Sequence, residues 1–110
     1  MINIEQFSQI EIRAGKILSV EYIEGADKLL KLSVDMGEET PRQILSGIRL
    51  YFEDPIQALT GITCGFVANL EPRVIRGLES QGMILGVSDT DGNFSLLTID
   101  SKILPGTRVK

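Results

Sequence analysis

Short stretches of alternating apolar and polar residues, separated by turn signals, run through the sequence. The clearest stretch ends just before the polar connection Gly37–Thr40. A period of two residues is typical of a strand with one buried face, so we expect a strand whose apolar side chains point inward. This strand is predicted from Leu29 to Met36, with Leu30, Leu32, Val34 and Met36 on its inward face.

The same pattern predicts a long first strand from Ile10 to Tyr22. Gly15 lies inside it, and a glycine within a strand often marks a bulge or a sharp bend. Arg13 falls on the opposite, outward face, and Gly25–Lys28 predicts the turn that follows, where an aspartate could cap a brief helical turn. The apolar face of the strand is expected to hold Ile10, Ile12, Ala14, Leu18, Val20 and Tyr22.

Three more strands and a C-terminal hairpin follow along the chain. The Asp-Gly pair at Asp91 and Gly92 is a strong turn signal and precedes the last apolar run. The tail after Leu104 is expected to be an extended segment. The predicted strands span Arg42–Ile48, Ile62–Asn69 and Ser80–Val87, and the apolar run after the turn spans Phe94–Ile99.

A helical turn is predicted at the N-terminus, from Asn3 to Phe7. Asn3 and Gln6 have the spacing of a capping box, in which each side chain bonds the other residue's backbone. Ile4 and Phe7 would make one apolar edge. We expect this edge to close the bottom of the core.

A second short helix is predicted between Asp54 and Gly61. Asp54 is a favourable N-cap, a proline follows at the first helical position, and Gly61 suits the end of the helix. Ile56 and Leu59 are three residues apart and are expected to share the buried face.

The order of elements is three strands, a short helix, two strands and a C-terminal hairpin. Short strands joined by turns, with a bent first strand, indicate an all-β protein built as a small closed barrel. The helix between strands three and four favours the five-stranded OB-fold barrel, with a C-terminal extension. We predict one domain over residues 1–110, with the barrel at about 8–88 and the extension at about 89–110. OB-fold barrels commonly bind nucleic acids or sugars.

Composition narrows the function classes. The chain has no His and one cysteine, Cys64, which argues against a metal site and allows no internal disulfide, as in a reducing compartment. We therefore predict no metal and no cofactor. No apolar run reaches the roughly 20 residues of a membrane span, and no secretory signal is visible, so a cytoplasmic location is expected. A net charge of −4 means that nucleic-acid binding would have to depend on a local cationic patch.

The segment from Phe66 to Leu85 carries the main candidate site. An apolar run leads into the polar, arginine-bearing connection Glu71–Gln81, and a second apolar run follows it. Binding residues often lie on connections held by a rigid scaffold. The pattern indicates a presented binding site without identifying its ligand.

Several motifs carry a resemblance to a known family. They include Asn-Leu-Glu-Pro-Arg at residues 69–73, Ser-Gln-Gly-Met at residues 80–83 and Ile-Arg-Ala-Gly-Lys-Ile at residues 12–17. The chain resembles the tRNA-binding OB-fold domain of many bacterial methionyl-tRNA synthetases, where it forms the C-terminal domain or a β-type subunit. The same domain occurs as a free structure-specific tRNA-binding protein and in the endothelial-monocyte-activating polypeptide. The resemblance runs from about Phe7 to the end of the chain.

The resemblance implies a non-catalytic domain that grips the outer corner or arm of folded tRNA by shape. It also implies a homodimer, with the region after the barrel forming much of the interface. Arginine and lysine would contact phosphates, and the amide and hydroxyl would bond sugar or base edges. Met83 would offer an apolar surface to a base, or else fill the core. The implied binding residues are Arg13, Lys28, Arg42, Asn69, Arg73, Arg76, Ser80 and Met83.

Alternative functions remain open at this point. The chain could be a free-standing tRNA-binding protein or a domain appended to a synthetase. The acidic net charge favours the appended domain, because tethering to an enzyme compensates for weak binding. A chaperone-like, peptide-binding homodimer of the same fold is the second class. A third class is an enzyme with a Ser–Lys pair, built from Ser80 or Ser46 with Lys28 or Lys16. The 69–73 and 80–83 motifs favour the tRNA-binding group.

Overall fold

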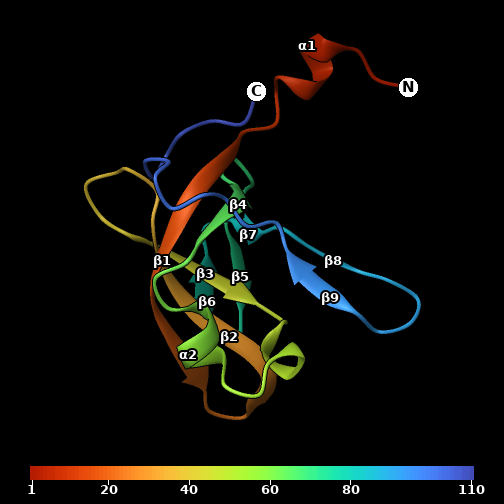
Figure 1. The fold of residues 1–110 in the computed structure, drawn as a ribbon. Coiled ribbons are helices and arrows are strands. Elements are labelled where there is room, and N and C mark those ends of the chain that lie inside the picture. The colour runs from red at the N-terminus through yellow and green to blue at the C-terminus, as the bar shows by residue number, and fades with distance from the viewer.

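A five-stranded antiparallel sheet forms the body of the molecule in the computed structural model, which describes residues 1–110 (Figure 1). Its strand order is β3-β2-β1-β4-β7, and neighbouring strands pair antiparallel throughout. The strands are β1 (Ile12–Ile23), β2 (Ala26–Asp35), β3 (Arg42–Ser46), β4 (Thr63–Val67) and β7 (Met83–Ile84).

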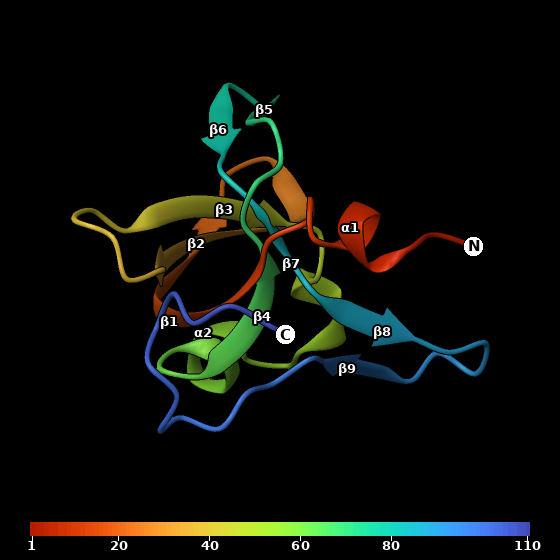
Figure 2. The ribbon, with the colours of Figure 1, turned by 90° about the horizontal axis from the view of Figure 1, so that it is seen from above.

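Two small hairpins extend from this sheet in different directions (Figure 2). One pairs β5 (Arg73–Ile75) with β6 (Leu78–Ser80), and the other pairs β8 (Gly86–Ser88) with β9 (Phe94–Leu96). Three short helical segments complete the chain. They are α1 (Ile4–Phe7), the 3₁₀ turn η1 (Arg49–Tyr51) and α2 (Pro55–Leu59). None of them is long and apolar enough to span a bilayer.

The two ends of the sheet meet where β3 approaches the chain between β6 and β7. The Gln81 backbone N–H donates to the Gln43 carbonyl at 2.8 Å, and the Gln43 N–H donates to the Gln81 side-chain oxygen at 2.9 Å. The Leu45 N–H donates to the Ser80 hydroxyl oxygen at 3.0 Å. These bonds join the edge strands, so the sheet curls into a barrel. The prediction of an all-β OB-fold barrel with a helix between the third and fourth strands is confirmed.

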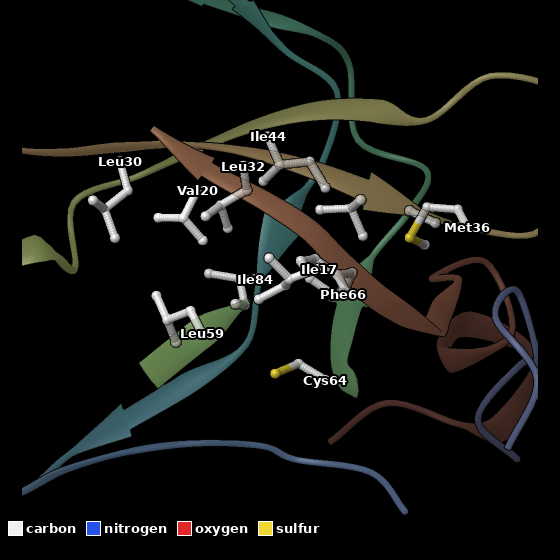
Figure 3. Packing of buried hydrophobic residues seen from close by; sticks show 12 residues of the cluster. Ile17, Val20, Leu30, Leu32, Met36, Ile44, Leu59, Cys64, Phe66 and Ile84 are labelled. Atoms are coloured by element: carbon white, nitrogen blue, oxygen red, sulfur yellow. The ribbon is translucent and has the colours of Figure 1, made fainter. Parts of the chain in front are cut away.

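The barrel interior is filled by apolar side chains from every strand of the sheet (Figure 3). The predicted inward face of β2, from Leu30 to Met36, is confirmed, since all four side chains are buried. Cys64 lies in the same cluster, and burial raises the pKa of its thiol to about 11. The thiol is therefore protonated near neutral pH and packs as a small apolar group, as the sequence indicated.

The first strand departs from its predicted face at Leu18. Ile17 lies opposite Val34 and Ser19 lies opposite Ser33, so Leu18 is an extra residue in the ladder. This bulge turns Leu18 outward and brings Ile17 into the core. The predicted inward positions of Leu18, Ile10 and Tyr22 are wrong, since each side chain is more than 40% exposed, whereas Val20 beyond the bulge is buried as predicted.

Gly15 has a role that differs from a bulge. A Cβ at this position would lie 2.6 Å from Phe66 Cδ1 and 2.7 Å from Met36 Sδ. The β1 backbone therefore passes against two core side chains at a distance that only glycine permits.

The helices are present as predicted, but their buried faces differ. Asn3 and Gln6 form the capping box of α1, and Asp54 caps α2 by accepting from Gln57 N–H. Ile4 is 73% exposed, so α1 does not close the core as expected. In α2 the buried residues are Pro55 and Leu59, whereas Ile56 faces solvent.

The C-terminal segment lies against the barrel and pairs with it. The Ala14 N–H donates to the Thr107 carbonyl at 2.8 Å, and the Val109 N–H donates to the Ile12 carbonyl at 2.7 Å. Farther along the barrel, the Gly65 N–H donates to the Leu97 carbonyl at 2.9 Å. The tail after Leu104 is not fully extended as expected, since it turns at Pro105 and Gly106 before it pairs with the start of β1. The chain at Leu97 pairs with β4.

Gly15→Ala tests the close packing of β1. The added methyl group cannot fit without displacing Phe66, and overpacking of this kind costs about 1–3 kcal/mol of unfolding free energy. Gly47→Ala is the matched control, because nothing lies within 4 Å of a Cβ there. Urea unfolding of both variants measures the difference. Equal midpoints for the two variants would contradict the packing described.

Candidate functional site

The eight candidate residues fall into two groups according to how their side chains are engaged. One group makes hydrogen bonds within the protein, mostly to backbone groups. The other group is exposed and makes no internal hydrogen bond or ion pair. The first group contains Arg13, Arg42, Asn69 and Ser80, and the second contains Lys28, Arg73, Arg76 and Met83.

Arg42 stands at the start of β3 and joins three parts of the chain. Its Nε and Nη2 donate to the two carboxylate oxygens of Glu38, both at 2.8 Å. Its Nη1 donates to the carbonyls of Ala68 and Gln81, the latter at 3.1 Å. The Arg42 hydrogen bond lowers the pKa of Glu38 and raises that of Arg42. This guanidinium therefore ties β3 to the ends of the connection between β4 and β7.

Asn69 uses its amide in the same way at the end of β4. Its oxygen accepts from the Glu11 N–H at 2.8 Å, and its nitrogen donates to the Gln9 carbonyl at 2.6 Å. The amide fixes the chain that enters β1 against the chain that leaves β4. Both of these partners are distant in sequence, so Asn69 links two separate segments of the chain.

Arg13 and Ser80 are also engaged internally. Arg13 donates to Glu11 Oε1 at 2.8 Å and to the Gly106 carbonyl at 2.9 Å, and it is therefore only partly exposed. The Arg13 hydrogen bond lowers the pKa of Glu11. The buried Ser80 hydroxyl accepts from the Leu45 N–H and donates to the Gly82 carbonyl at 3.2 Å. The Ser–Lys pairs considered from sequence are not formed, since no lysine bonds a serine hydroxyl.

Arg73 and Met83 line one groove beside the β5–β6 hairpin. Its apolar wall is made by Leu45, Leu70 and Ile75. Met83 is 47% exposed, so it faces this groove and not the core. Arg73 lines this groove together with Glu71, and it forms no ion pair. The predicted polar connection is thus a hairpin that presents a cation above an apolar surface.

Arg76 lies at the tip of that hairpin with a left-handed backbone. Its φ is +52°, and the following Gly77 has φ +77°. Few residues other than glycine, asparagine and aspartate adopt this conformation. Arg76 Nη1 reaches the β1–β2 turn, where it would lie 3.7 Å from a Cβ on Gly25. Lys28 is close by in β2, within a bulge formed where the ladder skips from Ala26 to Leu30. No helical turn forms there.

Sequence reasoning missed a further cation at the same end of the barrel. Arg49, in η1, places its guanidinium carbon 4.1 Å from the centre of the Tyr22 ring. Arg49 makes no ion pair, because all ion pairs in the structure involve other residues. No local sequence signal could have found this pair, since the two residues belong to separate elements that meet only in the fold.

Comparison with known proteins finds a consistent group of relatives. A family model described as "Putative tRNA binding domain" matches residues 12–108. The methionine–tRNA ligase of Deinococcus radiodurans is 44% identical over 110 residues, which are all of this chain and 16% of that protein. The corresponding ligase of Xylella fastidiosa strain M23 is 45% identical over 109 residues, or 99% of this chain and 15% of that protein. The chain thus spans about one sixth of these curated relatives.

Two solved structures share the fold of this chain. A MetRS-related protein from Pyrococcus horikoshii superposes with a TM-score of 0.90 at 33% identity, covering 100% of this chain and 98% of that one. The CsaA chaperone protein from Picrophilus torridus superposes with a TM-score of 0.84 at 28% identity, covering all of both chains.

Arg42→Ala and Arg73→Ala should separate the two groups of site residues. Removing Arg42 leaves two carbonyls and Glu38 without their donor, so unfolding should become easier by about 1–3 kcal/mol. Removing the exposed Arg73 should change the unfolding free energy by less than about 0.5 kcal/mol. Thermal or urea unfolding measures both. If Arg42→Ala proves as stable as Arg73→Ala, Arg42 does not join the barrel edges.

Proposed function

The chain belongs to the tRNA-binding domain family, and we propose that it binds folded tRNA through phosphate contacts and carries out no reaction itself. The observation that supports this most directly is a group of four cations that form no ion pair. Lys28, Arg49, Arg73 and Arg76 form no ion pair in a chain whose net charge is −4. Cations left unneutralised on an acidic protein provide the local patch that phosphate binding needs.

The two groups of site residues would contribute differently to this binding. The exposed group would meet the RNA directly, with Lys28, Arg73 and Arg76 at phosphates and Met83 at an apolar base surface. The internally bonded group would hold the presenting segments in place, because its donors and acceptors already have partners. Arg13 and Arg42 also keep part of their surface exposed, so their charge would add to the attraction of the RNA.

Binding by so few cations is expected to be modest and sensitive to salt. Each phosphate neutralised on a nucleic-acid duplex contributes about 0.9 to the slope of log affinity against log salt. We therefore propose that the chain works best when tethered, as an appended domain or β-type subunit of methionyl-tRNA synthetase. Tethering raises the effective concentration at the second binding step. Such a role would place the protein in the cytoplasm, where tRNA is charged.

A free-standing tRNA-binding protein is the alternative form of the same function. The Pyrococcus horikoshii protein supports it, since 98% of that chain is covered by this one. A domain of this size therefore occurs as a separate chain in a solved structure.

A homodimer is the second part of the proposal, and its support is an exposed apolar surface at the end where both termini lie (Figure 1). There α1 stands away from the barrel, with Ile4 and Phe7 beside Val109 in a shared groove. Leu104 is 76% exposed on the same C-terminal segment. Exposed apolar side chains gathered at one end of a protein are typical of interfaces. We propose that the N-terminal helix and the extension after about residue 89 form the dimer contact.

A chaperone-like, peptide-binding homodimer of the same fold is the second candidate function. The likeness to the Picrophilus torridus chaperone supports the shared fold. The cations at the other end of the barrel would have no role in that function, and we therefore favour tRNA.

Arg73→Ala and Arg76→Asn should each weaken tRNA binding and lower the salt slope by about one, because each removes one phosphate contact. Asparagine tolerates the left-handed backbone at residue 76, so the fold is preserved. Fluorescence anisotropy with labelled bulk tRNA at several salt concentrations measures both quantities.

The matched control is Lys102→Ala, which removes one exposed charge from the C-terminal segment. Its affinity and slope should match those of the unmodified chain. Unchanged binding in both arginine variants, or an equal loss in the lysine variant, would overturn the proposed patch.

Ile4→Glu should convert the dimer to monomers, because it places a charge on the proposed apolar contact. Leu50→Glu is the control, since Leu50 is 70% exposed on η1 at the opposite end. Analytical ultracentrifugation of both variants gives the oligomeric state. A point substitution is preferable to deleting the extension, whose backbone bonds to β1 and β4 support the fold. A dimer that survives Ile4→Glu would exclude α1 from the interface.

A further inference from the structure

Arg49 and Tyr22 form a layered pair on the outside of the barrel. The guanidinium lies over the ring, and Tyr22 remains 45% exposed. A guanidinium stacked on tyrosine stays planar while its outer face and its N–H groups remain available. Because Arg49 has no carboxylate partner, the pair is a flat, positively charged surface open to a ligand.

The segment that carries Arg49 is held firmly in place. Tyr51 stacks on Phe94 with ring centres 4.1 Å apart, and Phe52 meets the same ring edge-on at 5.8 Å. These contacts fasten η1 to the β8–β9 hairpin. Arg49 is thus positioned before any ligand arrives, which reduces the conformational entropy lost on binding.

Two of the other unpaired cations lie near this pair. Tyr22 is the penultimate residue of β1, and Arg76 Nη1 approaches Gly25 in the β1–β2 turn that follows. Lys28 follows the turn within the bulge of β2. The turn and η1 lie at the end of the barrel away from both termini (Figure 1). The β1–β2 turn therefore brings Arg76 and Lys28 to the same end of the barrel as the stacking pair, together with the carboxylates of Glu24 and Asp27.

We propose that the Arg49–Tyr22 pair receives an unpaired base of the bound RNA while Lys28 and Arg76 contact the adjoining phosphates. This inference rests on the proposed function and deepens it by naming the part of the RNA that the domain recognises, an unpaired base. Unpaired RNA bases stack on aromatic rings and on guanidinium planes, whereas a continuous helix offers mainly phosphates and hydroxyls. The pair would thus let the domain prefer folded RNA with exposed bases over a plain duplex.

The test compares bulk tRNA with a fully paired RNA duplex of equal phosphate number, using fluorescence anisotropy and the full chain. Tyr22→Leu should lower tRNA affinity by about fivefold to 100-fold, the range for loss of one stacked base, and leave duplex affinity unchanged. Arg49→Lys should also lower tRNA affinity without altering the salt slope, because lysine keeps the positive charge but lacks the planar guanidinium on which a base can stack. Tyr22→Trp should retain the affinity.

Tyr22→Trp also supplies a second measurement, since the chain contains no tryptophan of its own. Its emission should shift to shorter wavelength when tRNA covers the pair and should not shift with duplex. Val87→Trp, at an exposed position on β8, is the matched control and should show no shift with either RNA. If thermal unfolding shows that Tyr22→Leu does not fold, the emission shift of Tyr22→Trp tests the proposal in its place.

The possible outcomes distinguish a failure of the proposed tRNA binding from a failure of the proposed base stacking. No tRNA binding by the unmodified chain at low salt would overturn the proposed function, and the inference with it. Normal tRNA binding with unchanged affinity in Arg49→Lys and no emission shift in Tyr22→Trp would overturn the inference alone. Equal losses for tRNA and duplex would also overturn it, because the pair would then act through charge or folding.

Discussion

The junction between β3 and the chain on either side of the β5–β6 hairpin is the constraint on which this structure depends. Two edge strands must meet there, yet the chain between β4 and β7 leaves the sheet to form the hairpin. Side chains replace the missing ladder. The Arg42 guanidinium bonds the carbonyls of Ala68 and Gln81, and the Ser80 hydroxyl accepts from the Leu45 N–H. Without these bonds, backbone groups at the junction would be left unpaired, at a cost of about 1–3 kcal/mol for each buried group.

The junction also determines which polar residues remain available for a ligand. Arg13 and Arg42 carry charge, but each guanidinium is held by a carboxylate and a backbone carbonyl. Arg73 and Arg76 stand on the hairpin that the junction supports, without such partners. A motif residue can therefore serve a site by fixing its frame or by touching the ligand. Only the hydrogen bonds of the folded chain distinguish the two roles.

The barrel separates two surfaces of different character. Cations without ion pairs lie on the β1–β2 turn, η1 and the β5–β6 hairpin, and the Arg49–Tyr22 pair is among them. The opposite end gathers both termini and exposed apolar side chains such as Ile4 and Leu104. A dimer formed at the second end would leave the cations of both copies accessible. This separation would let an acidic chain present a local cationic surface and still associate through apolar contacts.

Residue order alone placed β1 to β4, the helix caps and the all-β fold class of this protein, because these depend on local period and turn chemistry. It did not predict the β5–β6 hairpin, and the strand expected over Ser80–Val87 is divided among β6, β7 and β8. The alternation in β2, the capping box at Asn3 and the Asp54-Pro55 helix start were all predicted correctly. The motifs also predicted the tRNA-binding family. Only the tertiary structure placed Leu18 outside, because a bulge depends on the pairing of two strands. Tertiary structure likewise made Arg42 and Asn69 structural links and brought Arg49 onto Tyr22, since these contacts join residues that no local pattern relates.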